Sequence, residues 1–258
     1  MQFRPVLAIP LVLLAVSLKA HAASPDSSIN ATPSSVATVE LFTSEGCSSC
    51  PPADALLRQI NLKQTNAGQL IIGISEHVTY RDNLGWKDPY SSPVFTDRQS
   101  TYALRLSPEG PYTPQMVLNG GDQFVGSDGP ALERALRNDA RRGHFALHII
   151  SSAPASDGID VKRALSGNLS KPLDIIAVVA DDMDRSNVVR GENGGRQLQH
   201  VSVARSVARV ATVRNDGEQS VRVSLPEGML TGSPGHHLIL FAQEPHQGAI
   251  VGATTTAF

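Results

Sequence analysis

Cysteine is scarce in this chain of 258 residues, which contains only Cys47 and Cys50. A second C-x-x-C or C-x-x-H pair, which would complete a four-ligand zinc site, is absent from the sequence. A surplus of positive charge is also missing, because 22 Lys and Arg residues stand against 24 Asp and Glu residues. The formal net charge of −2 becomes −4 once Arg4 and Lys19 are removed with a signal peptide. We therefore expect binding neither to nucleic acid nor to an anionic membrane.

Long apolar runs are missing beyond the N-terminus. Residues 6–18 form an apolar run after Arg4, but the run is shorter than the roughly 20 residues of a membrane span. Residues 20–22 then read Ala-His-Ala, the A-x-A pattern of a cleavage site. We predict a signal peptide over residues 1–22, a polar linker over residues 23–35, and export to the periplasm or secretion. An uncleaved N-terminal anchor is the alternative.

The most informative segment is residues 39–54, which holds both cysteines. A strand-like run leads into a Ser/Glu/Gly turn, the C-x-x-C follows, and Pro51 and Pro52 stand where a helix would begin. A thiolate at a helix N-terminus is stabilised by unpaired backbone N–H groups and by the helix dipole. Its pKa falls, and it becomes a nucleophile near neutral pH. The pattern therefore favours redox chemistry.

Two other interpretations of the cysteine pair stay open. An oxidising compartment makes a resting Cys47–Cys50 disulfide the expected state, and it could be purely structural. A loop of four residues, however, stabilises a fold by only about 2 kcal/mol, against about 4.7 kcal/mol for a long loop. Metal binding is the second alternative, with Cu(I) held by Cys47, Cys50 and His77. Only three methionines follow the signal peptide, and the sequence has no Met/His-rich tract to support copper delivery.

Residues 36–143 alternate between strand and helix signals. We expect strands at 36–42, 69–74, 113–118 and 123–125, and helices at 52–64, 93–106 and 131–141. The resulting order, β-α-β-α-β-β-α, is that of an α/β thioredoxin-like domain.

Residues 144–258 change to a pattern of short strands separated by turns. Seven such runs are expected, at 144–150, 159–164, 173–180, 198–213, 220–225, 237–242 and 249–255. They predict a mainly antiparallel β-sandwich-like C-terminal domain that presents a surface or has a purely structural role.

Five segments carry a family resemblance: residues 39–57, 84–89, 112–117, 124–128 and 191–196. In these segments the chain resembles a family of secreted bacterial and plant proteins catalogued as domain of unknown function 1223, and more distantly the thioredoxin superfamily. The resemblance covers nearly all of the mature chain. It implies a thioredoxin-like domain with a β-rich C-terminal part, and little about activity. Residues 77–82 depart from it, because His-Val-Thr-Tyr-Arg-Asp stands where the family has His-Val-Asp-Tyr-Trp.

The thioredoxin resemblance implies roles for individual residues. Cys47 would be the more exposed, attacking thiol, and Cys50 would resolve the mixed disulfide. Pro114 would follow a cis peptide bond and open the third strand beside the cysteines, so that Thr113 and Pro114 wall a substrate groove.

Further side chains are candidates for the rim and the electrostatics of that groove. His77 and Trp86 are candidates for the groove, although a His at a strand end and a lone Trp more often have structural roles. Glu45 and Asp54 would raise the pKa of Cys47 if they pointed inward. Residues 191–196 lack the spacing of a phosphate-binding loop, and Asn193-Gly194 predicts a hairpin turn.

Together these features predict an exported thiol–disulfide oxidoreductase. Its partners would be protein or small-molecule thiols and disulfides, and it would need no cofactor beyond the disulfide. A non-catalytic exported binding module, such as a Cu(I) carrier, is the alternative.

Overall fold

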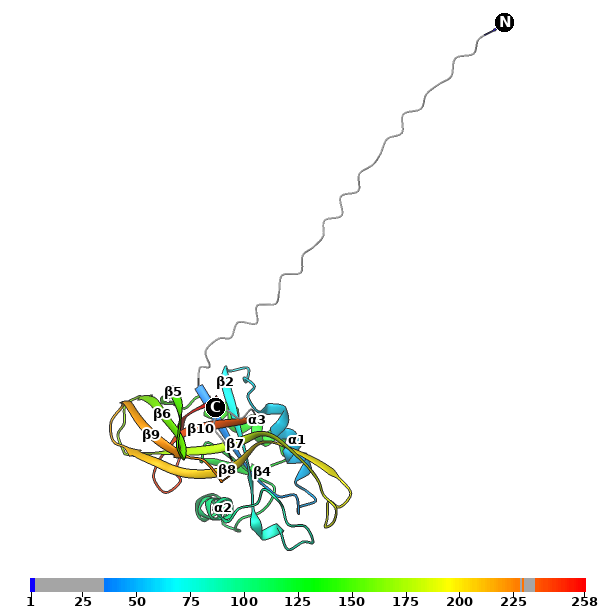
Figure 1. Ribbon diagram of the computed structural model, residues 1–258, viewed down its shortest axis with the longest axis horizontal. Coiled ribbons are helices and arrows are strands. Elements are labelled where there is room, and N and C mark those ends of the chain that lie inside the picture. The colour runs from blue at the N-terminus through cyan, green and yellow to red at the C-terminus, as the bar shows by residue number, and fades with distance from the viewer. Residues whose placement is uncertain (3–34, 228, 230–234) are drawn as a thin grey trace. The chain divides into compact units, whose positions relative to one another are not determined.

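A computed structural model describes residues 1–2, 35–227, 229 and 235–258 (Figure 1). The predicted signal peptide and linker lie outside the described residues, apart from residues 1, 2 and 35. The chain from Pro33 to Phe258 forms one compact unit. Within the described part of the chain, we find no helix with the length and apolar character that a membrane crossing requires.

Eight strands form the main sheet, in the order β11-β10-β7-β8-β2-β1-β3-β4. In chain order they are β1 (Ser35–Thr43), β2 (Gln69–His77), β3 (Gln115–Leu118), β4 (Asp122–Val125), β7 (Leu173–Asn187), β8 (Gln197–Val213), β10 (His236–Gln243) and β11 (Ile250–Ala257). β2 runs parallel to β1 and to β8, and the other neighbours are antiparallel. A second sheet has the order β5-β6-β9, formed by β5 (Ala146–Ala155), β6 (Gly158–Ser166) and β9 (Gly217–Ser224).

Helices cover both faces of the main sheet around β1. Because side chains alternate along a strand, Leu41 packs with Leu57 of α1 (Pro51–Ile60) on one face. On the other face, Phe42 packs with Tyr102 of α2 (Pro93–Leu106). Helix α3 (Gly129–Asp139) joins the α1 side, and a 3₁₀ turn spans Thr79–Arg81. Burial on both faces explains why residues 69–74 of β2 form a short continuous apolar run.

A buried ion pair lies on the α2 face. Arg98 Nε donates to Glu40 Oε1 at 2.6 Å, and Tyr102 Oη donates to Glu40 Oε2 at 2.7 Å. Glu76 lies 3.6 Å from the same Arg98 nitrogen. Burial and the neighbouring Glu40 raise the pKa of Glu76 well above its usual value, despite Arg98. Burial and the neighbouring Glu40 therefore favour the protonated form of Glu76.

The mixed α/β class is confirmed, and the elements from β1 to α3 follow one another as β-α-β-α-β-β-α apart from the 3₁₀ turn. The C-terminal strands differ from the prediction of a separate sandwich-like domain after residue 143. β7, β8, β10 and β11 continue the N-terminal sheet, and only β5, β6 and β9 form another sheet. Pairing of β8 with β2 covers what would otherwise be an open sheet edge. Local strand patterns do not specify such a partner, and the prediction missed it for that reason.

Candidate functional site

Cys47 and Cys50 form a disulfide where β1 turns into α1, with the two Cα atoms 5.4 Å apart. The turn is closed by hydrogen bonds from Cys47 N to Ser44 O, 3.1 Å, and from Cys50 N to Cys47 O, 3.2 Å. Cys50 is the N-cap of α1, and prolines occupy the first two helical positions, where a missing N–H costs no hydrogen bond. The predicted disulfide and its strand–turn–helix setting are confirmed.

The disulfide lies just beneath the surface. Cys47 is 2% exposed and Cys50 is fully buried, so the attacking sulfur of our prediction is only marginally the more accessible one. Ser48 and Ser49 between them are exposed, and Ser49 Oγ lies 3.4 Å from Cys47 Sγ. Cys47 therefore exposes little of its surface to an incoming thiolate.

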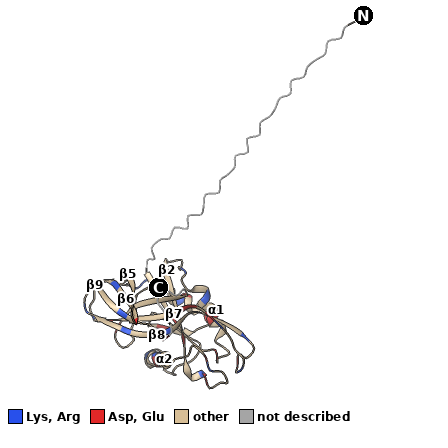
Figure 2. Cartoon of the chain, viewed as in Figure 1, with Lys and Arg blue, Asp and Glu red and all other residues tan. Residues whose placement is uncertain are grey.

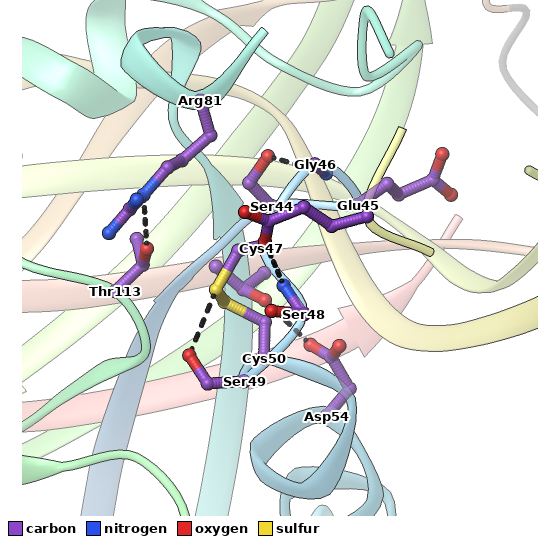
Figure 3. Close-up of a disulfide and its surroundings, with 12 residues drawn as sticks. Ser44, Glu45, Gly46, Cys47, Ser48, Ser49, Cys50, Asp54, Arg81 and Thr113 are labelled. Carbon is purple, nitrogen blue, oxygen red and sulfur yellow. Dashed lines mark hydrogen bonds between the residues drawn. A yellow bond between two sulfur atoms is a disulfide. The ribbon is translucent and has the colours of Figure 1, made fainter. Parts of the chain in front are cut away.

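Residues 113 and 114 lie beside this turn. The Thr113–Pro114 peptide bond is cis and precedes β3, as expected. Arg81 Nε donates to Thr113 Oγ1 at 3.0 Å, and Figure 3 shows this pair on one side of the disulfide. A Cβ at Gly46 would lie 2.7 Å from Arg81 O, so only glycine allows the chain after β2 to approach the turn this closely. Arg81 comes from the segment that departs from the family pattern.

The tip of the β7–β8 hairpin covers the other side of the C-x-x-C turn. Asn193 Nδ2 donates to Glu45 O at 2.8 Å and to Cys47 O at 3.0 Å, and Asn193 is fully buried. Ser48 N donates to a carboxylate oxygen of the exposed Glu192 at 2.9 Å. The expected turn at Asn193-Gly194 is present, with Gly194 N donating to Gly191 O. The hairpin tip therefore holds the backbone of the disulfide turn in place.

A buried charged cluster lies behind the turn, centred on His200 of β8. His200 Nε2 lies 3.3 Å from Glu45 Oε1, and His200 Nδ1 lies 3.6 Å from Asp54 Oδ1. Thr43 Oγ1 donates to Asp54 at 2.9 Å, and Trp86 Nε1 donates to Glu45 at 2.8 Å. Burial alone would lower the pKa of His200, but the two carboxylates outweigh it and raise the pKa to about 10. His200 is thus an imidazolium at neutral pH that compensates both carboxylates.

His77 and Asp88 extend this cluster. Their Nδ1 and Oδ2 atoms are 2.7 Å apart, and the ring of His77 lies edge-on to that of His200 at 4.6 Å. Asp88 also accepts from Glu45 N at 2.7 Å. Burial would raise the pKa of Asp88, but His77 and the backbone donors lower it to about 2. Asp88 therefore fixes both the His77 ring and the turn that leads to Cys47.

The structure separates the predicted groove residues into two groups. Thr113, which precedes Pro114, lies beside the disulfide turn (Figure 3), whereas His77 is fully buried in the charged cluster and Trp86 is half-buried against Glu45. Glu45 and Asp54 lie on the opposite side of the disulfide from Arg81 and Thr113 (Figure 3).

Sequence reasoning missed His200, Asp88, Asn193 and Arg81. His200 carried one usable signal. It shares the inward face of β8 with Leu198, so a polar residue occupies a position that alternation assigns to the core. Asn193 acts on residues about 150 positions earlier in the chain, for which no local pattern exists.

A Ser–His–Asp chain elsewhere in the sheet does not form a second site. Ser202 Oγ lies 2.9 Å from His237 Nε2, and His237 Nδ1 lies 2.6 Å from Asp182 Oδ1. Ser202 is fully buried and cannot reach a substrate, so the network is structural. Among the described residues, no three His, Cys, Asp or Glu side chains are grouped to hold a metal ion.

Comparison with known proteins supports the fold and the family. The crystal structure of a protein from Agrobacterium tumefaciens matches this chain with a TM-score of 0.66 and 27% sequence identity, covering 86% of this chain and 95% of that protein. No curated protein is significantly similar to the chain. The family model described as "Protein of unknown function (DUF1223)" matches residues 38–243, which include the whole disulfide site and its covering hairpin. The chain belongs to the DUF1223 family.

Proposed function

We propose that this protein is an exported, thioredoxin-like thiol–disulfide oxidoreductase that uses Cys47 and Cys50. The observation that carries the proposal is the pairing of a C-x-x-C disulfide at the start of α1 with the cis Thr113–Pro114 bond that precedes β3. The β-α-β-α-β-β-α order up to α3 supports the thioredoxin-like assignment. The signal-like residues 1–22 support export, where such a pair rests as a disulfide.

The reaction is an exchange of disulfide bonds. A substrate thiolate attacks Cys47 Sγ, the Cys47–Cys50 bond breaks, and Cys50 leaves with the electron pair and takes up a proton. A second substrate thiolate then attacks the mixed disulfide, which releases the oxidised substrate and the Cys47 thiolate. The reverse sequence reduces a substrate disulfide.

Several groups favour a Cys47 thiolate in the reduced protein. The N-terminus of α1 supplies the positive end of the helix dipole, although Pro51 and Pro52 have no N–H group and the N–H groups of Ala53 and Asp54 donate to Cys50 O. The Arg81 side chain approaches the disulfide on the Thr113 side (Figure 3). Glu45 and Asp54 oppose a thiolate less than the sequence suggested, because the protonated His200 compensates them.

Catalysed reduction of insulin by dithiothreitol tests the proposal. The wild type is expected to accelerate precipitation of the insulin B chain well beyond dithiothreitol alone, and Cys47→Ala to abolish the acceleration. Cys50→Ala is expected to accumulate mixed disulfides on Cys47, which mass spectrometry detects. The Ser152→Ala variant, changed at an exposed position of β5 away from the cysteines, serves as the control and is expected to remain active. Wild-type rates equal to those of dithiothreitol alone would refute the proposal.

The same preparation tests the copper alternative. Reduced protein that retains one Cu(I) against a chelator, and loses it when Cys47 and Cys50 are both replaced by Ser, would favour a Cu(I) carrier. His77, its predicted third ligand, is held by Asp88 at 2.7 Å.

A further inference from the structure

A cavity of about 420 Å³ opens between the start of α1 and the outer parts of β7 and β8. Its wall includes Pro51, Asp54 and Arg58 from α1, Arg185 from β7, and Arg196 from the hairpin tip. Clefts of this volume commonly hold small molecules.

Three arginines make the cavity positively charged. No carboxylate of the described residues lies within salt-bridge distance of Arg58, Arg185 or Arg196, unlike Arg98 and Arg222, which are both paired. Arg58 Nη1 donates to the Gln199 carbonyl at 2.5 Å and Arg196 Nη1 donates to Asn193 Oδ1 at 2.8 Å. These acceptors are neutral and leave the guanidinium charges uncompensated. Each guanidinium has five N–H donors, so donors remain for a ligand.

The one acidic residue in the wall does not cancel this charge. Asp54 is 4% exposed, accepts from Thr43, and faces the imidazolium of His200. The positive charge is also local, because the whole chain has a net charge of −2. Figure 2 shows positions of both signs interspersed along the helices and strands.

The cavity adjoins the disulfide turn. Pro51 in its wall directly follows Cys50. Arg196 binds the side chain of Asn193, which itself donates to Cys47 O. A ligand anchored by the arginines would therefore lie next to the C-x-x-C turn.

We propose that this cavity binds the carboxylates of a small acidic thiol, or of its disulfide, as the substrate of the Cys47–Cys50 couple. This inference rests on the proposed function. Arginine forks pair with both oxygens of a carboxylate, and the neighbouring disulfide requires a ligand that carries sulfur. In the exchange, two thiols are oxidised to one disulfide, the Cys47–Cys50 bond is reduced, and two protons pass to the cysteines.

Stopped-flow reduction of the protein disulfide tests the assignment with two probes. Mercaptosuccinate carries two carboxylates, and 2-mercaptoethanol carries none. Arg185→Gln is the main variant, Arg185→Gln/Arg196→Gln is the second, and Arg134→Gln on the exposed side of α3 is the charge-matched control. Because each probe is compared with itself across variants, differences in thiol reactivity cancel.

Loss of charged contacts is expected to slow mercaptosuccinate about tenfold in the double variant, and less in Arg185→Gln. 2-Mercaptoethanol is expected to change less than twofold, and Arg134→Gln to leave both rates unchanged. Equal losses for the two probes, or no loss in the double variant, would overturn the acidic-thiol assignment while leaving the oxidoreductase function intact.

Calorimetric titration with succinate, which has no sulfur, separates the two proposals. Succinate is expected to bind the wild type and to lose affinity in the double variant. If it does so while neither thiol reduces the disulfide faster than it reduces a C-x-x-C peptide, then the oxidoreductase function and the thiol assignment fail and only an anion site remains. Inorganic phosphate that binds as tightly as succinate would overturn the choice of carboxylate.

Discussion

Replacement of His200 by Asn probes the charged cluster behind the disulfide. In the wild type the imidazolium lies between Glu45 and Asp54, 3.3 Å and 3.6 Å from their nearest oxygens. Asn is uncharged and leaves two buried carboxylates without a compensating cation. We expect His200→Asn to lower the free energy of unfolding and to remove one component of its pH dependence.

The magnitude follows from the pKa of His200. It lies at about 10 in the folded protein against 6.5 as the reference. At about 1.4 kcal/mol per pH unit, this difference corresponds to roughly 5 kcal/mol of stability. Because the folded-state pKa is the higher one, the contribution is complete below pH 6.5 and is lost as the pH rises from 6.5 to about 10.

Urea denaturation between pH 6.5 and 9.5 measures this contribution. We expect the stability of the wild type to fall by about 1 kcal/mol per pH unit relative to His200→Asn, so that the two curves converge toward pH 10. The upper limit of pH 9.5 keeps the measurement below the titration of the neighbouring Tyr90. Burial is the main cause that raises the pKa of Tyr90 above its usual value. His148→Asn, at an exposed position of β5, is the matched control and is expected to follow the wild type. Parallel curves for the wild type and His200→Asn would refute the assignment of a buried imidazolium.

Three further predictions concern side chains around the disulfide turn and on the α2 face of the main sheet. Asn193→Ala loses two hydrogen bonds to the disulfide turn, so its free energy of unfolding, measured by urea denaturation, is expected to fall by about 2 kcal/mol. The same variant is expected to let dithiothreitol reduce the disulfide faster. An unchanged reduction rate would contradict the covering role of the hairpin. Asp88 has a pKa of about 2 against a usual 3.8, so its contribution to stability is present above pH 3.8 and is lost as the pH falls toward 2. The free energies of unfolding of the wild type and Asp88→Asn are therefore expected to converge as the pH approaches 2. A constant difference between the two proteins would argue against this contribution. Glu76→Gln is expected to change stability at pH 7 by less than about 1 kcal/mol, because burial and Glu40 favour the protonated form of Glu76. Glu40→Gln breaks the ion pair with Arg98 and is expected to cost about 3 kcal/mol or more. Equal losses of stability in the two variants would contradict this difference between the carboxyls.

The disulfide turn was predictable because its determinants are local. Residues 39–54 contain the strand, the turn, both cysteines and the prolines that begin α1. Each of these signals determines the backbone conformation of residues only a few positions away. Thr113-Pro114 was identifiable for a similar reason, because a proline before a hairpin strand with an Asn-Gly turn marks a specific place in the chain. The strands of the C-terminal half were also recognisable from their alternation.

The sequence alone determined that two thiols stand at a helix start, in a mixed α/β chain with export-like first residues. Tertiary structure decided what surrounds the thiols. Pairing of β8 with β2 brings His200 behind the turn, and the β7–β8 hairpin brings Asn193, Arg185 and Arg196 to it from more than about 130 residues away. The physical reason is that helix and strand propensities are properties of short segments, whereas partner choice between strands depends on the burial and pairing of the whole sheet.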